Sequence, residues 1–293
     1  MTATTSEKFR ARAFVVPASL FLAAFFLLPL IWIILISFSP SGHTDIAHEN
    51  WTLDNYKTFL SDSYYLYDLL WRTVRISVIA TVLSVVIGYI GTLAIIRAKP
   101  TTQTWLLFLC MCPLWVNLVV RTLSLMLVLG RDGALNKLMI WLGMINSPMQ
   151  LLYNETAVIL GMVQVSVPFV VLSLYGVLKS IPRELEHAAM SVGAGPVASF
   201  TRVTLPLSIP GVLAGGVLAL GINIESFVVP ILLGGGRVRF MSVAAYESAT
   251  ISNNLPFAAT IGVVLLVVTL LILGIYQFLL KPKRTDVGPL RSV

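Results

Sequence analysis

Residues Ile181 to Gly211 read IPRELEHAAMSVGAGPVASFTRVTLPLSIPG, a segment that carries helix signals without the hydrophobicity of a membrane span. Ser180 and Pro182 predict the start of a first helix, and Gly193-Ala194-Gly195 predicts its end. Pro196 suits the first turn of a second short helix. Two further prolines are expected to end that second helix, Pro206 and Pro210.

The first of these helices is predicted to be amphipathic. Residues spaced by three and four positions form one small apolar face: Leu185, Ala188, Ala189 and Val192. The other face is polar and carries Arg183, Glu184, Glu186 and His187. A helix-turn-helix of this kind between membrane spans suggests a docking surface for a soluble partner. An ordinary connecting loop is the alternative interpretation of the same pattern.

Composition places the rest of the chain in a membrane. Of its 293 residues, 57% are hydrophobic and 11% are charged, and the mean hydropathy is +0.89. Soluble domains carry about 25% charged residues. The sequence therefore predicts an all-α polytopic membrane protein and excludes a soluble core. The net charge of +7 comes from basic residues scattered through loops, which argues against a nucleic-acid partner and fits the positive-inside rule.

Six apolar segments are long enough to cross a bilayer, for which about 20 residues are needed. They lie near residues 13–38, 74–96, 105–129, 156–178, 207–233 and 257–280. A polar tail, residues 1–12, precedes this 13–280 membrane-spanning domain, and a basic tail, residues 281–293, follows it. In the second segment, a stripe of small residues at helical spacing predicts close helix packing, with a transport path as the alternative interpretation. This stripe consists of Ser77, Thr81, Ser84, Gly88 and Thr92.

The distribution of basic residues predicts the orientation. The two tails, the 97–99 turn and the 179–206 loop hold 12 of the 20 Lys and Arg residues, and the opposite side holds 6. Cytoplasmic loops of membrane proteins carry the excess of Lys and Arg. Both termini and the 181–206 segment are therefore expected in the cytoplasm.

Polar residues inside the predicted spans are candidates for a transport path. Arg121 and Glu225 are charged, and hydrocarbon disfavours an unpaired charge, so each needs a partner or a polar cavity. Asn117, Gln164 and Asn223 complete this set of candidates. Glu225 is the one acidic residue well inside a predicted span. It either receives a cationic substrate, pairs with Arg121, or is protonated and hydrogen-bonded.

The sequence contains no recognisable catalytic constellation. The patterns G-x-x-x-x-G-K-[ST], H-E-x-x-H and G-x-S-x-G do not occur. Three dispersed histidines, His43, His48 and His187, predict no metal site, and Cys110 and Cys112 point in different directions on a helix. We therefore expect no enzyme activity, cofactor or metal. If transport uses ATP, another chain must bind it.

The opening segment resembles the "EAA" signature of ATP-binding-cassette (ABC) importer permeases. His187-Ala188-Ala189, then Gly193, then Val203-Thr204-Leu205-Pro206 match its spacing. The family's glutamate position holds His187, with Glu186 beside it. The resemblance implies a type I importer fold of six transmembrane helices, in which the 181–206 segment is a cytoplasmic coupling helix pair. The residues it implies for ATPase docking are Glu186, His187, Ala188, Ala189, Gly193 and Phe200.

Further segments are similar to the spermidine/putrescine permease subfamily, including Asn117–Thr122, Val167-Pro168-Phe169 and Val229–Gly236. This likeness implies a bacterial inner-membrane importer with a second permease chain, two ATPase subunits, a periplasmic binding protein and a polyamine substrate. Glu225 lies where such permeases often carry an acidic residue, before Phe227. A permease for another small solute and an ion-coupled secondary transporter are the alternatives.

Overall fold

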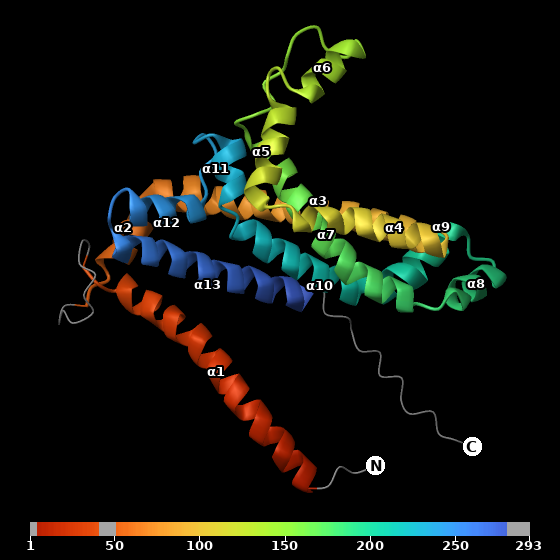
Figure 1. Cartoon of the computed structure of the whole chain (residues 1–293), viewed down its shortest axis with the longest axis horizontal. Helices are drawn as coiled ribbons and strands as arrows, with labels where there is room; N and C mark the ends of the chain where they lie inside the picture. The colour runs from red at the N-terminus through yellow and green to blue at the C-terminus, as the bar shows by residue number, and fades with distance from the viewer. Residues whose placement is uncertain (1–4, 41–50, 280–293) are drawn as a thin grey trace. The chain divides into compact units, whose positions relative to one another are not determined.

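The computed structural model describes residues 5–40 and 51–279, and every regular element in these ranges is helical (Figure 1). The chain divides into two compact units, Met1–Leu66 with Ala244–Leu266, and Tyr67–Val243 with Val267–Val293. The predicted C-terminal tail, 281–293, lies outside the described residues. The α-helices are α1 (Thr5–Ser37), α2 (Asp54–Ser61), α3 (Arg72–Arg97), α4 (Pro100–Met111), α5 (Leu118–Leu129), α6 (Ala134–Trp141), α7 (Glu155–Ser180), α8 (Arg183–Ser191), α9 (Pro196–Ser199), α10 (Leu205–Ile224), α11 (Val228–Gly234), α12 (Met241–Thr250) and α13 (Leu255–Leu279). Three short elements differ in type: η1 (Tyr64–Trp71) and η3 (Phe200–Thr204) are π-helical, and η2 (Cys112–Trp115) is a 3₁₀ turn.

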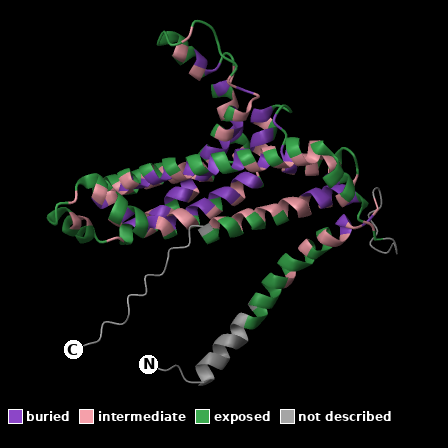
Figure 2. Ribbon diagram, turned by 180° about the vertical axis from the view of Figure 1, so that it is seen from behind, coloured by how far each residue is buried: buried purple, intermediate pink, exposed green. Residues whose placement is uncertain are grey.

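In the first unit, the end of α1 is fixed at Ser37. Its hydroxyl shares a 2.7 Å hydrogen bond with the Tyr56 hydroxyl of α2. Its carbonyl accepts hydrogen bonds from Asn55 Nδ2 and from Thr260 Oγ1 of α13, both 3.2 Å long. Most of the described part of α1 is exposed, as Figure 2 shows. Phe26, for example, is 72% exposed. Such an apolar exterior suits contact with lipid.

In the second unit, α3, α7 and α10 pack side by side, as Figure 1 shows. All five residues of the predicted small-residue stripe on α3 are buried, which confirms the predicted packing. Ser84 and Ser166 of α7 share a 2.7 Å hydrogen bond across this contact. On α10, Gly215 and Gly211 lie so close to α7 that an added Cβ would be 3.2 Å from Val170 Cα and 3.0 Å from Val177 Cβ, respectively.

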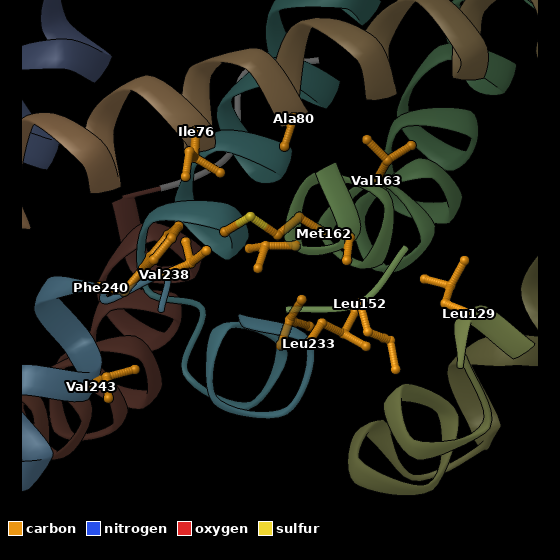
Figure 3. Close-up of a cluster of buried hydrophobic side chains, with 13 residues drawn as sticks. Ile76, Ala80, Leu129, Leu152, Met162, Val163, Leu233, Val238, Phe240 and Val243 are labelled. Carbon is orange, nitrogen blue, oxygen red and sulfur yellow. The ribbon is translucent and has the colours of Figure 1, made fainter. Parts of the chain in front are cut away.

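A hydrophobic cluster surrounds the start of α7 (Figure 3). Met162 of α7, Ile76 of α3 and Leu233 of α11 are each at most 1% exposed. Gly161 allows this approach, because a Cβ there would lie 2.5 Å from Leu233 Cδ1. The backbone N–H of Tyr153 donates to the Leu233 carbonyl at 2.9 Å, so α11 is fixed against the beginning of α7.

Within residues 5–40 and 51–279, five helices are long and apolar enough to cross a membrane, and there are six if one bent pair counts as a single span. This agrees with the predicted all-α, six-span fold. The third predicted span, 105–129, was wrong as a continuous helix, because the chain bends by 101° between Pro100–Trp115 and Leu118–Trp141. Pro113 cannot donate a backbone N–H, and the chain forms a 3₁₀ turn there. Asn117 then begins α5 as its N-cap and accepts a 2.8 Å hydrogen bond from Val119 N–H.

The predictions for the start and end of the fifth span also need correction. Pro206 and Pro210 do not end a short helix, because α9, η3 and α10 form one span, Pro196–Ile224. Leu205 N–H donates to Phe200 O five residues back, and the missing N–H of Pro206 falls at this change of hydrogen-bond register. At the other end, α10 stops at Ile224, and Gly234 ends the separate helix α11.

Replacement of Gly88 by valine is expected to destabilise the fold, because an added Cβ would lie 2.7 Å from Val170 Cγ1 and 3.0 Å from Val170 Cβ. Overpacking of this kind costs about 1–3 kcal/mol. Gly91→Val is the matched control, since a Cβ there meets nothing within 4 Å on the same helix. Thermal unfolding of the two variants in detergent checks this; equal melting temperatures would contradict the close α3–α7 contact.

Candidate functional site

The predicted amphipathic helix is α8, which follows the end of α7 in Figure 1. Pro182 is its N-cap, and its end is formed at Gly193, whose φ is +89°. Gly193 N–H donates to Met190 O at 3.0 Å, and Ala194 N–H donates to Ala189 O at 3.1 Å. Glycine adopts this left-handed conformation without steric strain, so the turn after α8 depends on Gly193.

One side of α8 is attached to the chain's own helices. Glu186 accepts a hydrogen bond from the hydroxyl of Thr204 in η3, and Ser199 Oγ donates to Glu186 O at 3.5 Å. Arg183 donates to the carbonyl of Ile96 at 3.0 Å, which connects α8 to the end of α3. These contacts set the position of α8 relative to the spans α3 and α10.

The other side of α8 is open. Leu185, Ala188 and Val192 are exposed, Val192 at 85%, and no residue of α8 is buried. His187 is also exposed, and the Ser191 hydroxyl donates to its carbonyl at 3.0 Å. We call Leu185, His187, Ala188 and Val192 the exposed α8 face. Most of the predicted apolar face is therefore uncovered in the single chain.

The structure separates the six predicted coupling residues into two groups. His187, Ala188 and Gly193 are exposed, whereas Glu186, Ala189 and Phe200 are partly buried. The Phe200 ring packs edge-on against Tyr89 of α3, with a centroid distance of 5.9 Å. Tyr89 OH and Ser208 Oγ share a further hydrogen bond of 2.8 Å. Glu186 and Phe200 thus position the segment, and a partner would meet the exposed group.

Two of the predicted path residues lie at the bend before α5. Asn117 caps α5, and Arg121 is 9% exposed and donates from Nη1 to Pro113 O at 3.1 Å. A cavity of about 380 Å³ opens beside them. Its walls also include Trp115, Val165 and Phe169 of α7 and Ile222 of α10. The cavity joins the bend to two spans, and Arg121 is its one charged lining residue.

The other three path residues lie outside this cavity lining. Gln164 is exposed on α7. Asn223 is 1% exposed and donates to Thr81 Oγ1 of α3 at 3.0 Å. Glu225 is exposed at the C-cap of α10, in the break before α11. Its N–H donates to Gly221 O at 3.2 Å, and Ser242 Oγ donates to the next carbonyl, Ser226 O, at 2.6 Å.

The geometry removes one interpretation of Glu225. Arg121 donates to the Pro113 carbonyl, and none of the ion pairs between described residues joins Arg121 to Glu225. The Glu225 side chain is exposed instead of lying well inside a helical span. Among the described residues, Glu225 is exposed and takes part in none of the ion pairs.

Some contacts of the site cannot be predicted from the amino-acid sequence. Thr204 and Thr81 hold Glu186 and Asn223, respectively, across 18 and 142 positions of sequence. The hydrogen bond from Arg121 to the Pro113 carbonyl depends on the bend between η2 and α5. Pro113 and the N-cap residue Asn117 are the local signals of this break.

Comparison with known proteins identifies the family. Residues 80–285 match the family model for the binding-protein-dependent transport system inner membrane component. The chain belongs to this family of ABC importer permeases. It is 31% identical over 252 residues to the spermidine/putrescine transport system permease protein PotB of Haemophilus influenzae, covering 86% of this chain and 87% of that protein. PotB of Escherichia coli is 30% identical over 255 residues, covering 87% of this chain and 92% of that protein.

The permease also matches solved structures of importers. A bacterial alginate ABC transporter in complex with an alginate pentasaccharide-bound periplasmic protein matches with a TM-score of 0.77 and 17% identity, covering 94% of this chain and 95% of that chain. This likeness supports the fold. The family gives the permease its place as a multi-pass inner-membrane component of a binding-protein-dependent importer, with ATP hydrolysis outside the chain. The secondary-transporter alternative is thereby set aside.

Proposed function

We propose that this permease forms part of the transport path for a polyamine, a small organic polycation such as spermidine or putrescine. The observation that carries the proposal is the 31% identity to a spermidine/putrescine permease over 86% of this chain. Glu225 supports it, because an exposed carboxylate at a helix break can accept hydrogen bonds from an ammonium group.

The same proposal assigns the exposed α8 face to an ATPase. The complex would contain a second, different permease chain, two ATPase subunits and a periplasmic solute-binding protein. Both termini and α8 would lie in the cytoplasm, which the distribution of Lys and Arg supports. Nucleotide-driven closure of the ATPases would move α8, and the contacts of Glu186 and Arg183 would pass that movement to α10 and α3.

A second candidate is a permease for another small solute. The cavity beside the bend is lined by Arg121 and by no carboxylate, a combination that suits an anion. A molybdenum transport system permease protein, ModB of Mycobacterium bovis, is 30% identical over 165 residues, covering 56% of this chain and 61% of that protein. An oxyanion such as molybdate is therefore the alternative substrate against which a polyamine is tested.

Calorimetric titration of the cognate periplasmic binding protein decides between these substrates. The polyamine proposal expects saturable binding of spermidine or putrescine and none of molybdate. Binding of molybdate with no response to any polyamine would overturn the substrate assignment. Polyamine-dependent stimulation of ATP hydrolysis by the complex in liposomes then checks that delivery occurs through this permease.

A further inference from the structure

A second cavity lies between the ends of α3 and α7 and the beginning of α8, away from the cavity beside Arg121. Its volume is about 220 Å³. Three cations line it, Arg97, Lys179 and Arg183, together with one carboxylate, Glu186, which gives the lining a formal net charge of +2. Apolar side chains complete the wall, among them Leu93, Leu178 and Ile181. The cavity thus combines a positive edge with an apolar interior.

The positive charge of this lining is not neutralised within the described residues. None of the ion pairs there includes Arg97, Lys179 or Arg183. The carboxylate of Glu186 already accepts the Thr204 hydroxyl. Lys179 Nζ donates to the Tyr175 hydroxyl at 3.1 Å, a neutral acceptor that leaves its charge in place.

The C-terminal carbonyls of α3, beside the cavity, do not occupy all of these cations either. Gln103 Nε2 donates to the carbonyls of Ile96 and Ala98 at 2.9 Å each, so a neutral amide satisfies the last carbonyls of α3. Arg183 adds a single hydrogen bond of 3.0 Å to Ile96 O. Arg97 and Lys179 are exposed at the cavity and can bind an anion.

We propose that this cavity binds the phosphodiester headgroup of an anionic phospholipid, held by Arg97, Lys179 and Arg183. Two candidate membrane spans, Tyr64–Arg97 and Glu155–Ser180, end at the cavity, so its cations lie where lipid headgroups gather. Leu93 and Ile181 of the wall are partly exposed and offer an apolar surface to the adjoining glycerol and acyl carbons. A free phosphate ion would leave that apolar surface without a partner. The lipid would brace the attachment of α8 to α3, and this inference is independent of the transported solute.

Titration of the purified full-length chain in nonionic detergent with fluorescent phosphatidylglycerol tests the proposal, with phosphatidylcholine as the uncharged comparison. Each Lys or Arg near a membrane surface contributes roughly fivefold to anionic-lipid affinity, so Arg97→Gln with Lys179→Gln should weaken binding about 30-fold. The matched control, Lys99→Gln with Arg202→Gln, removes the same charge from exposed residues outside the cavity lining. It should change the affinity by less than about twofold if binding is local.

Three outcomes would overturn the proposal. Equal affinity for the two lipids would show that charge plays no part. Equal loss in the two double variants would show that only the overall surface potential matters. Displacement of the lipid by millimolar inorganic phosphate would assign the cavity to a soluble anion. Unchanged circular dichroism of each variant verifies that the measured loss concerns the site and not folding.

Discussion

A valine in place of Gly193 is expected to uncouple ATP hydrolysis from transport in the assembled importer. Gly193 has φ +89°, and a side chain in this region strains the backbone even though a Cβ would meet nothing within 4 Å. Such strain costs about 1–3 kcal/mol per residue. The turn would relieve it by changing the end of α8, and substrate-stimulated ATP hydrolysis should fall about tenfold or more.

Gly195→Val is the matched control for this prediction. Gly195 lies two residues further on with φ −69°, and a Cβ there also meets nothing within 4 Å. The control adds the same side chain to the same loop at a backbone conformation that valine adopts readily. Normal stimulated hydrolysis in Gly193→Val, or an equal loss in both variants, would contradict a role for the turn geometry itself.

Replacement of Glu225 by glutamine is expected to lower polyamine uptake strongly while the complex still assembles. A hydrogen bond to a charged group contributes roughly 1.5–3 kcal/mol, which corresponds to about a 10- to 150-fold change. Glutamine keeps the size of the side chain and removes the charge. The measurement is uptake of radiolabelled spermidine into liposomes, together with the subunit composition of the purified complex.

Asp68→Asn provides the comparison for Glu225→Gln. Asp68 is also an exposed carboxylate near the end of a span, where it lies 3.6 Å from Arg72, and Arg72 keeps a second carboxylate in Glu155. We expect this variant to retain uptake. Loss of assembly in Glu225→Gln would instead assign Glu225 a structural role, and full uptake would remove it from the substrate path.

The helix α8 is predictable from the sequence because the signals that define it are local. Pro182 directly precedes Arg183, the first residue of α8. Gly193 lies two residues after Ser191, the last residue of α8. The small-residue stripe of α3 is equally predictable, since its five residues repeat at helical spacing. All five are buried, as expected. Composition was sufficient for the membrane class, and the long apolar segments were sufficient for its helical spans.

The breaks in the helices are not predictable from the sequence, because the effect of a proline on a helix depends on its surroundings. Pro206 is accommodated by the π turn of η3, so a helix continues through it, whereas Pro113 lies in a 3₁₀ turn that begins a 101° bend. The partners of Glu186 and Asn223 depend on how distant helices meet. No local pattern indicates that Thr81 faces Asn223 across 142 positions of sequence.

The most direct test of ATPase docking is a photo-cross-link from the exposed α8 face. A benzophenone placed on Val192→Cys, a position that is 85% exposed, would be activated in the purified complex with Cys110 and Cys112 replaced by serine. Trp141→Cys, at a position that is 80% exposed on α6, is the control. Docking of the ATPase on α8 predicts a cross-linked product containing the ATPase subunit from position 192 and none from position 141. The ATPase captured from position 141 but not from position 192 would contradict it.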